Sequence, residues 1–228
     1  FTLSACVDTM DTHPSSSFEE ETIWGSKSTV EAFINGIYDE VIRNAGYAGS
    51  GSSVQWEART PNAVKCSQVG EGIDGMATEL VIANVTGSEV LTETEKPGLL
   101  AQAHFLRGLI FFDQARKMGR FVPITIPLDP AKPEEAEIPM TANVAESYDY
   151  VISDLKIAAE GLPASNSYGL PTKWAADVIL SRAALQAYAY TNDAKYLDVA
   201  VAAASDVIDN SGIALSESSG LFNETDLY

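Results

Sequence analysis

The sequence predicts an all-α protein, built as an array of antiparallel helix hairpins with long irregular loops. Apolar residues recur at helical spacing in several stretches of 15 to 23 residues. Glycines, prolines or short polar breaks separate these stretches and mark where each helix stops. The chain lacks the alternating strand and helix pattern that a doubly wound sheet requires. We therefore expect helices packed on helices.

The first long helix is predicted to begin at a capping box formed by Ser28 and Glu31, and to stop near Gly46. A Gly/Ser-rich, irregular segment follows over residues 47–75. A short helix is expected around residues 76–84, before the next long apolar stretch.

The helix predicted over residues 97–118 carries apolar side chains on more than one face, so we expect it to be mostly buried. Leu106 and Leu109 should lie in the core. Arg107 interrupts the apolar stripe and should therefore have an acidic partner on a neighbouring helix. Gly119 should end the helix.

Residues 121–127 should be extended, because each of their two prolines disfavours helix at the preceding residue. A Pro/Glu-rich connector follows. Three more helices are predicted over 144–161, 172–190 and 194–208. Trp174 recurs at helical spacing with Ala and Val, and we expect it in the core.

Composition and charge exclude several classes of protein. The 228 residues are 46% hydrophobic and 20% charged, as in soluble globular proteins. The formal charge of −18 repels phosphate backbones and anionic lipid headgroups, so we expect no nucleic-acid partner. No apolar run approaches the roughly 20 residues that span a bilayer. With two cysteines and two histidines, we expect no metal site and no cofactor.

The start of the chain resembles a bacterial lipobox, because Leu3, Ser4 and Ala5 precede Cys6. This resemblance implies that residues 1–5 are the remnant of a signal peptide and that Cys6 carries lipid. Residues 6–25 would then be a lipidated flexible tether, and the protein would contact the membrane only through its lipid anchor. The alternatives are a Cys6–Cys66 disulfide or two idle thiols.

Four stretches, in the same order along the chain, resemble the SusD/RagB family of outer-membrane lipoproteins. The longest, residues 102–123, reads QAHFLRGLIFFDQARKMGRFVP and is similar to the family signature. It departs from that signature at Gln102, His104 and Gly108, where the family usually has Glu, Arg and Ala. The other three stretches are residues 32–38, 148–163 and 172–185.

The resemblance implies that residues 26–228 are the N-terminal, TPR-like helical domain of a longer SusD-like chain. It also implies a lipid-anchored, non-enzymatic protein on the outer-membrane surface of Bacteroidetes, active in polysaccharide utilisation. Such a protein captures glycans and hands them to a SusC-like TonB-dependent transporter. Two other functions stay open: a TPR-type surface adaptor that binds only protein or peptide, as in RagB-like members, and an acidic glycoside hydrolase fragment.

The irregular segment over residues 47–62 is expected to contribute to ligand contact. Sugar rings present flat C–H faces that stack on aromatic rings, and their hydroxyls need fixed polar partners. Tyr47 and Trp56 offer the rings, whereas Arg59 and Asn62 offer the polar groups. The resemblance supports this placement, because family glycan contacts come partly from loops in this region. The alternative is that Trp56 packs under a long loop.

Residues 70–75 match the G-x-G-x-x-G dinucleotide pattern, but two acidic residues lie inside the motif and no strand–helix–strand unit surrounds it. We expect a turn there. With two histidines in the chain, no Ser/His/Asp or Cys/His triad stands out, so the sequence predicts a protein that is not an enzyme.

Overall fold

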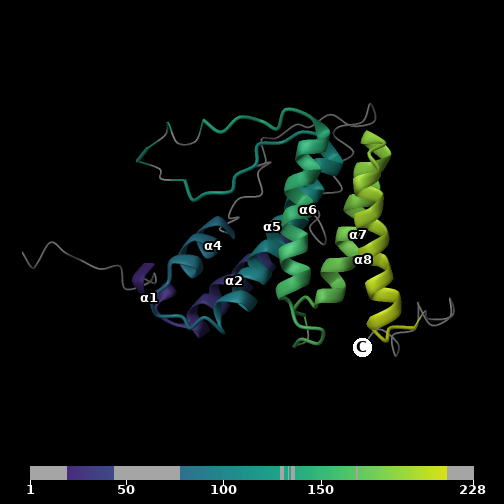
Figure 1. Cartoon of the computed structure of the whole chain (residues 1–228). Helices are drawn as coiled ribbons and strands as arrows, with labels where there is room; N and C mark the ends of the chain where they lie inside the picture. The colour runs from purple at the N-terminus through teal and green to yellow at the C-terminus, as the bar shows by residue number, and fades with distance from the viewer. Residues whose placement is uncertain are drawn as a thin grey trace, which may run out of the picture.

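The computed structural model describes residues 20–43, 78–128, 131–132, 134, 137–167 and 169–214. Every regular element in these ranges is a helix, which confirms the predicted all-α class. Figure 1 shows the helices in chain order. They are α1 (Glu20–Trp24), α2 (Lys27–Arg43), α4 (Thr78–Gly87), α5 (Lys96–Met118), α6 (Val144–Gly161), α7 (Lys173–Thr191) and α8 (Ala194–Asn210).

Helix α5 is the centre of the fold. One of its sides packs in an apolar cluster with α2 and α4, and the other packs in a cluster with α6, α7 and α8. Beyond α5, each helix packs on the next, α6 on α7 and α7 on α8, as in an array of hairpins (Figure 1). Leu106, predicted in the core, is buried in the first cluster, and Leu109 is half-buried between the two.

Two glycines allow α5 and α6 to approach closely. A β-carbon on Gly108 would lie 2.9 Å from Cγ of Leu155, and one on Gly161 would lie 2.7 Å from Cβ of Ala101. Both distances are shorter than carbon atoms tolerate. The tight contact between these helices therefore depends on the absence of a side chain at both positions.

Short polar residues begin the last three helices. The side chains of Asn143, Thr172 and Asp193 accept hydrogen bonds from the free backbone N–H groups of α6, α7 and α8. Gly119 ends α5 with a φ of 74°, a conformation that glycine adopts at low cost. These signals explain why the predicted and observed ends of α5 to α8 agree within two residues.

Two expectations were wrong. The residue that caps α2 is Ser26 instead of Ser28, because the helix begins at Lys27 and Ser26 Oγ accepts from the Thr29 amide at 3.3 Å. Trp174 is only half-buried, because it lies in the first turn of α7 with the Lys173 ammonium 4.7 Å from its ring centroid.

Candidate ligand-binding site

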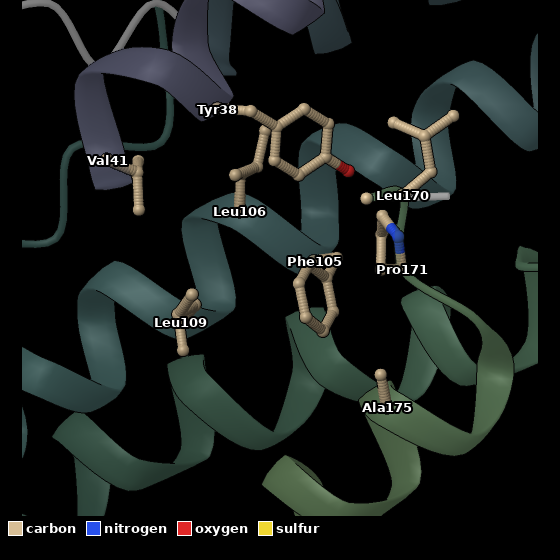
Figure 2. A pocket seen from close by; sticks show the side chains of 9 residues that line it. Tyr38, Val41, Phe105, Leu106, Leu109, Leu170, Pro171 and Ala175 are labelled. Carbon is tan, nitrogen blue, oxygen red and sulfur yellow. The ribbon is translucent and has the colours of Figure 1, made fainter. Parts of the chain in front are cut away.

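An apolar pocket of about 410 Å³ opens between α2, α5 and the segment that leads into α7 (Figure 2). Its lining is almost entirely carbon. A small set of residues forms it: Tyr38, Val41, Phe105, Leu106, Leu109, Gly169, Leu170, Pro171 and Ala175.

Two aromatic side chains line this pocket, Phe105 from α5 and Tyr38 from α2. Figure 2 shows the Tyr38 ring beside α5, with the hydroxyl on the side of Leu170. The hydroxyl donates a hydrogen bond to Gln102 Oε1 at 3.5 Å. Burial raises the pKa of the Tyr38 phenol, so it stays protonated and acts as a donor. The pocket therefore offers a flat apolar surface with one polar group at its edge.

A buried ion cluster joins α5 to α6 beyond the pocket. Arg107 Nε and Nη2 donate to the two carboxylate oxygens of Asp154, each at 2.8 Å, and His104 Nδ1 lies 2.7 Å from Asp154 Oδ1. The expected acidic partner of Arg107 is thus confirmed, on the neighbouring helix. Arg107 Nη1 also donates to the Thr125 carbonyl at 3.4 Å. Because these groups satisfy one another inside the protein, we assign them a structural role.

His104 is a contact that the sequence analysis did not anticipate. It occupies the position where the family signature usually has arginine. Its ring and the Arg107 guanidinium both contact the Asp154 carboxylate. Asp154 lies fifty residues further along the chain, so only the packing of α6 on α5 brings the pair together. The signal available in the sequence was a one-turn spacing, since His104 and Arg107 share one face of α5.

All of the ligand-contact and lipidation residues predicted from the sequence lie outside the described residues, as do Cys66 and the glycine motif at 70–75. They stay predictions. They are Cys6, Tyr47, Trp56, Arg59 and Asn62.

Within the described ranges, no three His, Cys, Asp or Glu side chains are placed to hold a metal ion. The helices described there include none with the length and apolar character to cross a membrane. The described helices form a scaffold with two surface pockets.

Comparison with known proteins places this helical scaffold in a family. A model of the SusD-like family, described as starch-binding and associating with the outer membrane, matches residues 71–185, half of the chain. The match covers α4, α5, α6 and most of α7. The chain belongs to the SusD-like family.

Relatives agree with this assignment. A SusD-like protein of Bacteroides ovatus is 24% identical over 93% of this chain and 43% of its own length. A SusD superfamily structure from Bacteroides vulgatus shares the fold with a TM-score of 0.68 at 17% identity, over 90% of this chain and 48% of that one. NanU of B. fragilis has a TM-score of 0.67 at 16% identity, over 95% and 48%. The chain thus spans less than half the length of these relatives.

Proposed function

We propose that this protein is a lipid-anchored, cell-surface protein that captures glycans and delivers them to a SusC-like TonB-dependent transporter in the outer membrane. The match to a starch-binding, outer-membrane-associated family over α4 to α7 carries the proposal. A structure solved with a xylogluco-oligosaccharide has the same fold, with a TM-score of 0.54 at 21% identity over 83% of this chain and 31% of that one.

The position of the apolar pocket supports a glycan site near the end of α2. Tyr38 and Val41, on the last two turns of α2, line the pocket. Tyr47 follows Val41 by six residues, and six residues of chain span at most about 22 Å. We propose that Tyr47, Trp56, Arg59 and Asn62 contribute ring-stacking and polar contacts beside this pocket.

We propose that capture involves no chemical change of the glycan. Hydrolysis would need two carboxyl groups facing each other across the scissile bond, at a separation of about 5–9.5 Å. The described residues that line the pocket include neither a carboxyl group nor a nucleophile with a neighbouring base. His104 is already engaged by Asp154. The pocket residues can hold a sugar ring but offer no acid–base pair.

Affinity gel electrophoresis against a polysaccharide panel tests the proposal on the full-length protein. We expect retardation by at least one polysaccharide, and calorimetry should show weaker binding in Trp56→Ala and Tyr47→Ala. Tyr190→Ala is the matched control, because Tyr190 is an exposed aromatic on α7 outside the pocket. Circular dichroism checks that each variant is folded.

Other outcomes would replace the proposal. If no polysaccharide binds while peptides do, the protein is a surface adaptor. Release of reducing sugar from a bound polysaccharide would instead show a glycoside hydrolase. Unchanged affinity in both aromatic variants would remove Tyr47 and Trp56 from the site.

A further inference from the structure

A second depression, of about 650 Å³, runs between α6 and α8 with α7 beneath it. We call it the acidic groove. Its floor is apolar, with Ala159, Leu180, Val199 and Ala203 among its residues. Each of the three helices also adds charged side chains. These are Lys156 and Glu160 from α6, Lys173 and Asp177 from α7, and Asp198 and Asp206 from α8.

Asp177 is the unusual member of the groove. It is only 5% exposed, and its Oδ2 atom has no hydrogen-bond partner among the described residues. Lys173, one turn earlier on α7, attracts Asp177 through space, but its ammonium donates its hydrogen bond to Asp206 Oδ2 at 2.5 Å. A buried carboxyl oxygen without a partner costs free energy, which a donor supplied by a ligand would recover.

The charges around Asp177 determine whether that ligand should be a cation or an anion. With Lys173 occupied by Asp206, three carboxyl groups remain, on Glu160, Asp177 and Asp198, against the single ammonium of Lys156. An anion would be repelled by this excess. A metal ion lacks the three grouped ligands that it needs in this part of the structure. An organic cation satisfies both the charge and the missing donor.

We propose that the acidic groove binds a ligand bearing an ammonium or guanidinium group, with the cation at Asp177 and its carbon stem on the apolar floor. Glu160 and Asp198, on opposite sides of the groove, add long-range attraction. Two sources share this chemistry: a lysine or arginine side chain of a peptide, and an amino sugar of a glycan. The site is separate from the pocket at Tyr38 and does not depend on the proposed function.

Isothermal calorimetry on the full-length protein, at low salt, tests the proposal with three probes. They are a glucosamine tetramer, its N-acetylated counterpart and the capped peptide acetyl-Gly-Lys-Gly-amide. The first two have the same sugar backbone and differ in charge. We expect one or both cationic probes to bind, with affinity falling as salt rises. If the glucosamine tetramer binds, the acetylated tetramer should bind at least tenfold more weakly. Which cationic probe binds identifies the source.

Variants locate the binding. Asp177→Asn and Glu160→Gln should each lower the affinity for the cationic probe, Asp177→Asn by at least tenfold. Glu89→Gln makes the same charge change between α4 and α5, outside the groove, and should leave the affinity unchanged. Glu160 is exposed, so its variant cannot fail merely by unfolding.

The proposal is overturned if neither cationic probe binds, or if Asp177→Asn binds as the unmodified protein does. If both tetramers bind with equal affinity, the proposal is also overturned, since recognition would then belong to the sugar ring. If the polysaccharide panel gives no binding while the cationic probes bind at Asp177, glycan capture fails and the acidic groove stands.

Discussion

The guanidinium of Arg107 on α5 holds both carboxylate oxygens of Asp154 on α6, through two hydrogen bonds of 2.8 Å each. Both residues are buried, with exposures of 7% and 4%. The pair spans 47 positions of sequence and lies beside Gly108, one of the two glycines at which the helices approach closely. It therefore fixes the register of α5 on α6 through a planar, two-pronged contact.

Arg107→Met should destabilise the protein by about 3–5 kcal/mol, because Asp154 would keep a buried charge with only His104 beside it. Urea unfolding at neutral pH measures this change. The double variant Arg107→Met with Asp154→Leu removes both charges and should recover part of the loss. An Arg107→Met protein as stable as the original would show that the pair contributes nothing.

Acid should weaken the same contact. Burial alone raises the pKa of Asp154, but the hydrogen bonds and charges of Arg107 and His104 outweigh it and hold the pKa below its ordinary value. A lowered carboxyl pKa adds stability above the ordinary value of about 3.9. That stability is lost as the pH falls through this value toward the folded-state pKa.

The free energy of unfolding should therefore drop between about pH 5 and pH 3, and Asp154→Asn should flatten this dependence. Urea titrations at several pH values measure both slopes. Glu95→Gln is the control. The Thr92 backbone amide lowers the pKa of Glu95, but this side chain is exposed, so its contribution is screened. An unchanged slope in Asp154→Asn would contradict the account.

Local signals in the sequence predicted much of the fold. Helix α5 has Pro97 as its second residue and ends before Gly119, and α7 begins after Thr172, so backbone chemistry set these boundaries. The cap of α2 was misplaced because Ser26 and Ser28 both stand near the start of a helical pattern. Periodicity also placed Trp174 on an apolar face without showing that this face ends at the edge of the protein.

Contacts between helices could not be predicted from the sequence. The sequence predicted an acidic partner for Arg107, but thirty-two acidic residues were candidates, and only the packing of the helices selects Asp154. The isolation of Asp177 likewise depends on Lys173 reaching Asp206, thirty-three residues away. Spacing along one chain reports which residues share a helix face, not which two faces meet.

The core around α5 gives a third prediction. Leu106 is 1% exposed between α2, α4 and α5, so Leu106→Ala should cost about 2–5 kcal/mol through lost burial and the cavity left behind. Leu185→Ala makes the same change on α7, where the side chain is 54% exposed, and should stay within about 0.5 kcal/mol. Urea unfolding compares the two. Similar losses would contradict the assigned core.

Two glycine variants test the close approach of α5 and α6. Gly108→Ala would place a methyl group against Leu155 and should destabilise the protein by about 1–3 kcal/mol. Gly36→Ala, in the middle of α2 with nothing within 4 Å of the added carbon, should stabilise it by about 0.5–1 kcal/mol. Thermal unfolding should show midpoints that move in opposite directions. A gain in stability from Gly108→Ala would refute the close packing.

Lipid attachment at Cys6 is tested with both cysteines of the chain. A bacterial lipoprotein carries its lipid on the cysteine sulfur, and several acyl chains hold it stably where one alone binds weakly. In the native host, Cys6→Ala should therefore move the protein from the membrane fraction to the soluble fraction, as measured by fractionation and immunoblotting. Cys66→Ala removes the other thiol and should leave the protein in the membrane fraction. A Cys6–Cys66 disulfide would make the two variants behave alike, and membrane retention of Cys6→Ala would refute the anchor.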